Sequence, residues 1–149
     1  MKKVILYHFL FLIVLAGISA QLHFGYVPAV VEQKKLLLTC ILLGGFGGVL
    51  YCLRGVYLNA SVRGEWSPQW EPWHYIRPVV SLVCGGISFV FLKAGLLLLE
   101  AESKPESTAL GFMALAFVAG LNVDKFVSKI EEIAQASWGI ERSRASKSE

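Results

Sequence analysis

The sequence has little charge, few cysteines and a single aspartate. Charged residues make up 17% of its 149 positions, whereas soluble domains average about 25%. Hydrophobic residues make up 55%, which is more apolar surface than a soluble protein of this size can bury. The composition therefore predicts one domain in a membrane. The formal net charge of +3 gives no argument of its own for nucleic-acid binding.

The common motifs of enzymes are missing as well. The chain contains no HExxH, phosphate loop, GxGxxG or GxSxG. Asp124 is the only aspartate, and Glu131 and Glu132 are adjacent, so on a helix they point about 100° apart and form no paired-carboxylate site. The three histidines fall on different predicted segments, at His8, His23 and His74. We therefore expect a protein that is not an enzyme and that has no cofactor.

The cysteines are few and lie in apolar surroundings. Cys40, Cys52 and Cys84 are within or at the edge of apolar runs, and no CxxC occurs. An odd number without CxxC argues against a disulfide framework or a zinc site. We expect three small buried side chains and no metal ligand.

Four apolar segments organise the chain into a transmembrane domain over residues 1–123. The predicted spans are about 4–22, 36–53, 79–99 and 109–123. At about 1.5 Å per residue, the first three are long enough to cross a hydrocarbon core of about 30 Å. The fourth reaches about 22 Å, so it either crosses where the bilayer thins or forms a re-entrant hairpin. The fold class is an all-α membrane protein with four helices, the last one short.

The first segment has a second interpretation. Its two lysines, apolar run and small residues before Gln21 are typical of a secretory signal. The apolar run is longer than a usual signal core, and Ile18 suits a cleavage site poorly. We therefore expect a retained helix.

Lysine and arginine predict how these spans are oriented. If both termini are inside, four basic residues lie outside, and ten of the 14 are cytoplasmic: Lys2, Lys3, Arg54, Arg63, Arg77, Lys125, Lys129, Arg142, Arg144 and Lys147. The opposite orientation reverses that ratio. We therefore predict cytoplasmic termini and a cytoplasmic loop over residues 54–78. This orientation puts His8 and His74 on the inner side and His23 on the outer side.

The predicted loop 54–78 contains three of the four tryptophans, bracketed by arginines. Tryptophan collects at membrane interfaces whatever a protein does, so an anchoring belt is the first interpretation. The second is a ligand platform, because nucleobases stack on aromatic rings, at about 1–3 kcal/mol per base, while basic groups bind phosphates. Both can hold. The candidate ligand residues, two of them from the tail, are Arg54, Arg63, Trp66, Trp70, Trp73, Arg77, Lys125 and Lys129.

Small residues and one proline predict how the helices begin and pack. Glycine lets membrane helices approach closely, and the packing candidates are Gly44, Gly48, Gly85 and Gly120. Three spans with such faces are more than one chain needs, which predicts a homo-oligomer; the alternative is packing within the chain. Pro78 follows Arg77, and because proline favours the first turn of a helix, we predict that the third span starts there.

Residues 124–149 form a second region, predicted to be cytoplasmic. Apolar residues with helical spacing predict an amphipathic helix from Val123 to Trp138, with Asp124 at its start and Gly139 as its stop. A polar end follows. Such a helix can line a vestibule, lie on the membrane or bind another protein.

Two stretches resemble segments of small bacterial multi-pass membrane proteins. In that group Arg-Pro opens a span, as in IRPVVSLVCGGISFVFLKAGLLLL, and an Ala-Phe-x-Ala-Gly turn leads from a short last span into an amphipathic cytoplasmic helix, as in ALAFVAGLNVDKFVSKIEEIA. Leu121 replaces the usual aromatic residue, and residues 122–125 replace a run similar to Ser-Glu-Arg. The resemblance covers about residues 76–136.

Within this group the chain resembles the membrane effectors of the Hailong anti-phage defence system. That resemblance implies a homotetrameric channel in the bacterial inner membrane. A single-stranded DNA oligomer made by a partner nucleotidyltransferase would hold it shut from the cytoplasm, and loss of that DNA would depolarise the cell.

We predict such a channel, with membrane lipids, further copies of the chain and the DNA oligomer as partners. As pore residues we predict Asn122 and Asp124, which are the polar residues at the inner end of the shortest span. The alternative is a non-conducting docking subunit that recruits a soluble partner through its C-terminal helix.

Overall fold

The computed structural model describes residues 1–95 and 105–141, and within these ranges every regular element is helical. The helices are α1 (Lys2–Phe24), α2 (Ala29–Gln33), α3 (Lys35–Tyr57), α4 (Glu71–Lys93), α5 (Pro105–Leu121) and α6 (Val123–Trp138). A π-helical turn, Leu58–Val62, prolongs α3, and a 3-10 turn, Pro68–Trp70, leads into α4.

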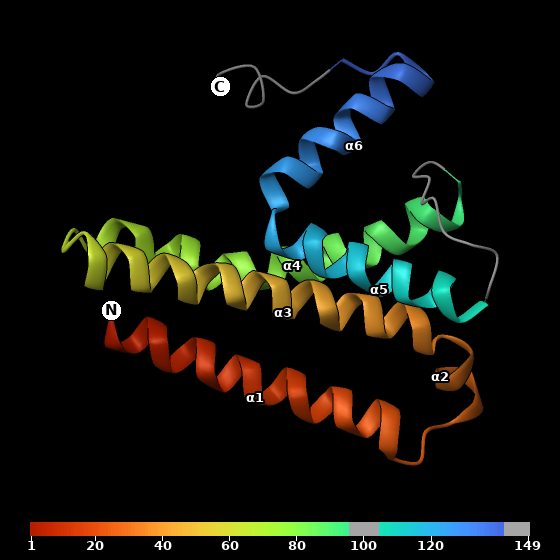
Figure 1. The fold of residues 1–149 in the computed structure, drawn as a ribbon, viewed down its shortest axis with the longest axis horizontal. Helices are drawn as coiled ribbons and strands as arrows, with labels where there is room; N and C mark the ends of the chain where they lie inside the picture. The colour runs from red at the N-terminus through yellow and green to blue at the C-terminus, as the bar shows by residue number, and fades with distance from the viewer. Residues whose placement is uncertain (96–104, 142–149) are drawn as a thin grey trace.

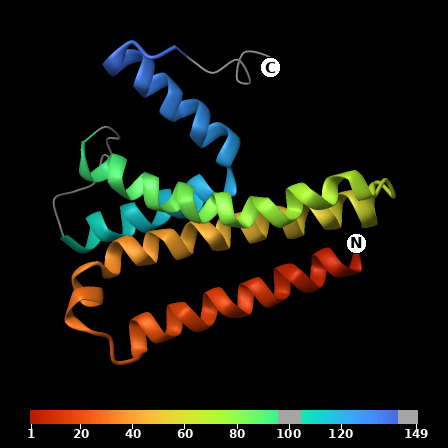
Figure 2. The same ribbon diagram turned by 180° about the vertical axis from the view of Figure 1, so that it is seen from behind.

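Four helices lie side by side and alternate in direction. Along the bundle α1 and α4 run one way, while α3 and α5 run the other way (Figures 1 and 2). The central helix is α3, which contacts α1, α4 and α5. The apolar contact between α1 and α3 is made by Leu15 and Leu22 with Leu42 and Val49, all buried. Helix α6 leaves the middle of this bundle instead of extending it.

Within residues 1–95 and 105–141, three helices are long and apolar enough to cross a membrane. They are α1, α3 with its π-turn (Lys35–Val62), and α4 with its 3-10 turn (Pro68–Lys93). The pair formed by α5 and α6 is a fourth candidate, and it is bent by 111° at the break between them, as in a broken span or a re-entrant loop. The predicted all-α fold is confirmed for the described residues. Of the four predicted spans, three have the length and composition to cross a membrane, and the fourth does so only if the bent pair is one span.

Glycines bring α3, α4 and α5 into backbone contact. A Cβ atom added at Gly44 would collide with the backbone of Ser81 and Gly85, and one at Gly120 would collide with the backbone of Gly44. At Gly48 the added atom would meet the Ser81 side chain. All four predicted glycines therefore pack helices, but they do so within one protomer. These contacts fit the alternative of packing within the chain, and they give no support for an oligomer.

The predicted start of the third span at Pro78 was also wrong. Helix α4 begins at Glu71, and Pro72 occupies the first turn, where its missing N–H costs nothing. Pro78 lies inside the helix, where it cannot donate to the carbonyl oxygen of His74. A neighbouring helix compensates, because the Cys52 thiol donates to that oxygen over 4.0 Å, a weak bond.

Other helix ends also differ from the predicted apolar runs, since α3 continues to Tyr57 and α4 begins at Glu71. Of the predicted loop 54–78, only residues 63–67 are outside helices. Helix α4 ends at Lys93, and residues 96–99 of the predicted span lie outside the described residues. The tail helix has the predicted bounds, and Gly139 ends it with a left-handed φ of 67°. The short α2 was not predicted.

Replacing Gly120 with alanine is expected to destabilise the protein by about 1–3 kcal/mol, as overpacking does, because the new Cβ meets the Gly44 backbone. Gly17→Ala is the matched control. A Cβ there meets nothing within 4 Å, and helix propensity favours alanine by up to about 1 kcal/mol. Thermal unfolding of the detergent-solubilised protein measures both. Equal stability of the two variants would contradict the close packing.

Candidate functional site

Arg77 is a buried cation at the contact between α4 and the α5–α6 break. Its side chain is only 1% exposed. The Nη1 group donates to Oδ2 of Asp124 over 2.8 Å, and Nη2 lies 3.5 Å from the Leu121 carbonyl oxygen. The guanidinium carbon lies 4.1 Å from the centre of the Tyr51 ring and 5.1 Å from that of the Trp73 ring. An ion pair and two aromatic faces therefore hold this charge.

The α5–α6 break, with the α4 side chains that hold it, forms a site that we call the elbow: Arg77, Ser81 and residues 120–124. A helix end leaves carbonyl groups without helical partners. Ser81 Oγ donates to the Gly120 carbonyl over 2.9 Å, and Arg77 approaches the next carbonyl. A cation at the end of α5 and Asp124 in the first turn of α6 both suit the helix dipoles. The elbow lies beside Gly44 and Gly47, at mid-length of α3.

The two predicted pore residues are both at this elbow. Asn122 is exposed at the N-cap of α6, and the Asp124 side chain is 63% exposed although it pairs with Arg77. Lys125 follows and lines a groove of about 430 Å³ together with Asn122 and Val118. Polar groups of both signs therefore reach the protomer surface at mid-length of the bundle.

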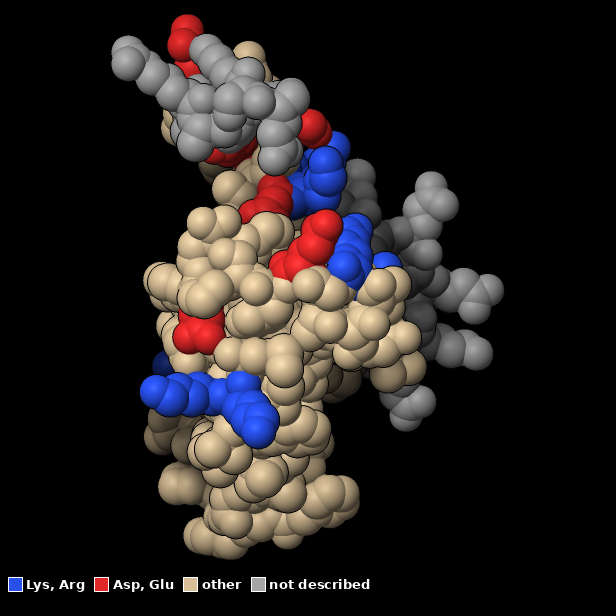
Figure 3. Space-filling model, turned by 90° about the vertical axis from the view of Figure 1, so that its left-hand side faces the viewer, with Lys and Arg blue, Asp and Glu red and all other residues tan. Residues whose placement is uncertain are grey.

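A second site, which we call the Arg/Trp cavity, opens at the end of the bundle that holds the N-terminus. Its volume is about 330 Å³, and its walls include Arg54, Arg63, Trp70 and Trp73. Arg63 is oriented by a hydrogen bond of 3.4 Å to Asn59 Oδ1. Figure 3 views this end of the molecule and shows interspersed acidic and basic side chains, with an uncharged region below them over α1. Four of the eight predicted ligand residues are thus brought together.

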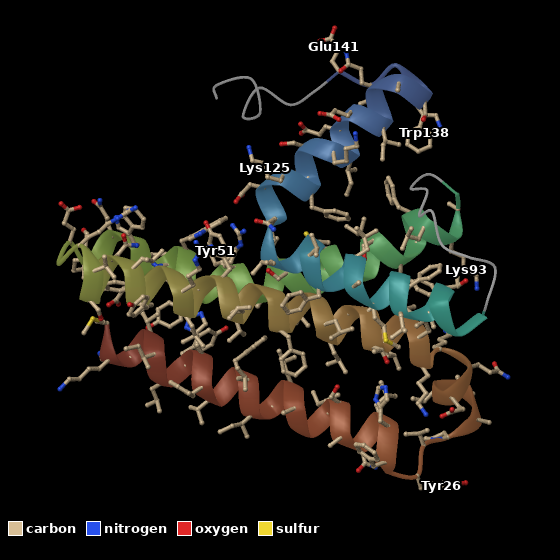
Figure 4. The ribbon with its side chains drawn as sticks, in the orientation of Figure 1. Tyr26, Tyr51, Lys93, Lys125, Trp138 and Glu141 are labelled. Atoms are coloured by element: carbon tan, nitrogen blue, oxygen red, sulfur yellow. The ribbon has the colours of Figure 1, made fainter. Side chains whose placement is uncertain are left out.

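The other four predicted ligand residues lie elsewhere. The Trp66 ring lies 5.4 Å from the His74 ring. Arg77 is engaged by Asp124, so a ligand would have to displace that carboxylate. Lys125 and Lys129 belong to α6, and Figure 4 labels Lys125 at the start of that helix. Lys129 pairs with Glu132 over 3.0 Å. The predicted set therefore divides among the cavity, the elbow, α6 and, for Trp66, a position against the His74 ring.

A buried group that sequence reasoning missed adjoins the cavity. His8 is fully buried, His74 is 4% exposed and Cys52 is fully buried. Their ligand atoms, one from each residue, lie within 4.8 Å of one another. His8 Nε2 and His74 Nδ1 are buried without a hydrogen-bond partner in the described structure, which costs about 1–3 kcal/mol for each atom. The available signal was that both histidines were predicted on the inner side, His8 at the inner end of the first span and His74 in the loop 54–78.

Removing the counter-ion of Arg77 is expected to lower the free energy of unfolding of the protein. Asp124→Ala should cost about 1–3 kcal/mol because it strands a buried charge; this is less than for a fully buried pair, since the Asp124 side chain is 63% exposed. In an Arg77→Leu background the same change should cost under about 0.5 kcal/mol. Glu32→Ala, which breaks an exposed pair with Lys35, is the control and should also cost under about 0.5 kcal/mol. Unfolding titrations in detergent measure all four variants. Equal costs of Asp124→Ala with and without Arg77 would contradict the coupling.

Comparison with known proteins gives no independent indication of function. No family model, no curated protein and no solved structure matches the chain. The resemblance to the Hailong membrane effectors therefore stays a prediction.

Proposed function

We propose that the protein is an oligomeric ion channel whose pore passes the elbow. The observation that carries this proposal is the position of the α5–α6 break at mid-length of α3, a helix long and apolar enough to cross a membrane. Irregular backbone at such a depth is tolerated only where it is buried in protein or lines water. Asn122 is exposed there, and Asp124 is 63% exposed, so water suits this surface better than lipid.

The exposed face of α5 supports a pore-lining role for that helix. From Leu110 on, the exposed positions recur at intervals of four residues, at Leu110, Ala114 and Val118 of α5 and at Asn122 in the break after it. Positions four apart share one helical face. Around a common axis, this stripe would form an apolar wall that ends in the polar groups of the elbow. In the proposed homotetramer each group appears four times, which multiplies a small local charge.

The Arg/Trp cavity supports a phosphate-bearing aromatic ligand as the effector of this channel. Trp70 and Trp73 are 47% and 43% exposed, so a nucleobase can stack on either ring. Arg54 and Arg63 are exposed in the same cavity and can bind phosphates. The volume of about 330 Å³ is at the lower end of ligand sites, which suits one nucleotide unit of a longer oligomer.

Together with the resemblance, these features favour an effector of anti-phage defence in the bacterial inner membrane. In this proposal both termini and the Arg/Trp cavity face the cytoplasm. A single-stranded DNA oligomer made by a partner nucleotidyltransferase occupies the cavities and holds the channel shut. Loss of the oligomer opens the pore and depolarises the cell.

The surface of α6 favours a second candidate, a docking subunit that does not conduct. The helix projects from the bundle (Figure 1), and its Phe126 is buried against α4 and α5. Val127 is 42% exposed, Trp138 is 59% exposed and the following Ile140 is 58% exposed. Apolar groups on a projecting amphipathic helix can bind a soluble partner.

Reconstituted protein is expected to conduct in planar bilayers, and a single-stranded DNA oligomer on the side that carries the cavity should suppress the current. Asn122→Leu should reduce open-state conductance because it removes the polar end of the α5 stripe, while Gln33→Leu, at the end of α2, should leave it unchanged. No conductance in any state would overturn the channel proposal. A stoichiometric soluble partner that is lost on truncation after Lys125 would then favour docking.

Removing one wall of the Arg/Trp cavity is expected to weaken binding of a fluorescent DNA oligomer. Trp70→Ala and Arg63→Ala should each lower the affinity about tenfold, which corresponds to about 1.4 kcal/mol within the range of a stacked base, at normal membrane levels. Affinity should fall further with salt. Trp138→Ala and Lys34→Ala, outside the cavity, are the matched controls. If the Trp70 and Arg63 variants instead lower membrane levels and leave affinity intact, these residues belong to an anchoring belt.

A further inference from the structure

His8, Cys52 and His74 bring together two imidazoles and a thiol from three different helices. The residues come from α1, α3 and α4, and their ligand atoms lie within 4.8 Å of one another. The two histidine rings are perpendicular, with centroids 5.9 Å apart. All three side chains are more than nine-tenths buried. Neither the elbow nor the proposed ligand chemistry uses this cluster.

The hydrogen bonds of His8 orient one ring nitrogen into the cluster as an acceptor. His8 Nδ1 lies 2.7 Å from the carbonyl oxygen of Val4, and because a carbonyl only accepts, Nδ1 must carry the hydrogen. In the neutral ring Nε2 then has a free lone pair, and it is buried without a partner. Metal-binding histidines are oriented in this way, with the second nitrogen bonded to a carbonyl or carboxylate. His74 Nδ1 is likewise buried and unpartnered within the described structure.

We propose that these three residues bind one Zn²⁺ ion. Imidazole nitrogen and thiolate sulfur are the ligands that zinc prefers, and three protein ligands leave a fourth position for water or another small ligand. Around a tetrahedral zinc ion these ligand atoms lie about 3.3–3.6 Å apart. Since no pair is more than 4.8 Å apart, none has to close by more than about 1.5 Å, which side-chain rotation can supply. No fourth ligating side chain joins the cluster in the part of the chain described.

The ion would fasten α1 to the rest of the bundle. Next to His8, Tyr7 Oη already joins α1 to α4 by donating to the Tyr75 carbonyl over 3.1 Å. The Cys52 thiol donates only weakly to the His74 carbonyl, which Pro78 leaves free. Binding zinc as a thiolate costs this weak bond to the His74 carbonyl and the deprotonation of a buried thiol. The proton of the thiol is released to solvent as the zinc–sulfur bond forms. The site does not depend on the channel proposal.

The test is metal binding by the full chain in detergent, purified without metal-affinity resin. After removal of metal and addition of Zn²⁺, we expect one zinc per chain by elemental analysis. Addition of Co²⁺ instead should produce a near-ultraviolet thiolate-to-cobalt band and the intense visible bands of a tetrahedral ion. Cys52→Ser should abolish the thiolate band, and His8→Gln should weaken zinc affinity at least about 100-fold, since loss of outer-shell partners alone costs about 10–100-fold.

Cys84→Ser and His23→Gln are the matched controls, since they change a buried cysteine and a histidine outside the cluster. Both should keep zinc and the cobalt band. Zinc should raise the unfolding temperature of the metal-free wild-type protein and leave that of His8→Gln unchanged.

A wild-type chain that binds less than about 0.2 equivalents of metal, or whose cobalt spectrum has no thiolate band, overturns the proposal whether or not the variants fold. A band that persists in Cys52→Ser overturns it as well. Binding of Cu⁺ in place of Zn²⁺ overturns the assignment of the ion.

Discussion

A cation buried among apolar helices has to be neutralised, and the contact between Arg77 and Asp124 does this here. The pair forms directly after the end of α5 at Leu121. The carboxylate is supplied by the first turn of α6, and the break between the two helices brings it to the guanidinium. The same arginine approaches a carbonyl that the break frees, and Ser81 satisfies the one before it. Close packing through Gly44 and Gly120 then holds α5 where these contacts can form.

Two aromatic rings link this pair to the Arg/Trp cavity. Tyr51 and Trp73 lie over the Arg77 guanidinium, and both also line the cavity (Figure 4 labels Tyr51). A ligand stacked on Trp73, as proposed, would therefore contact a ring that lies over the Arg77 guanidinium. His74 lines the same cavity and belongs to the proposed metal-binding cluster. Three sites on different helices thus share one short stretch of α4, from Trp73 to Arg77.

The sequence predicted the elements whose signals are local. Apolar runs located the long helices, and the bounds of α6 followed from helical spacing and Gly139. The prediction that a helix starts at Pro78 failed because it used only the preference of proline for a first turn. It did not consider Cys52, a residue of another helix that donates to the carbonyl oxygen which Pro78 leaves free. The glycines were identified as packing residues, but spacing alone does not reveal which surface they meet. The pairing of Arg77 with Asp124 and the meeting of His8 with His74 depend on which helices lie side by side, and no pattern within one segment encodes that.

The separation of the Arg77 pair along the chain has a consequence for synthesis. Asp124 follows Arg77 by 47 residues, and ribosomes add about 5–20 residues per second, so the arginine waits for roughly 2–10 s before its partner exists. During that interval Arg77 cannot take its buried place against α5 and α6 without leaving its charge unpaired. The contact that fixes α4 against the start of α6 can therefore form only after most of the chain has been made.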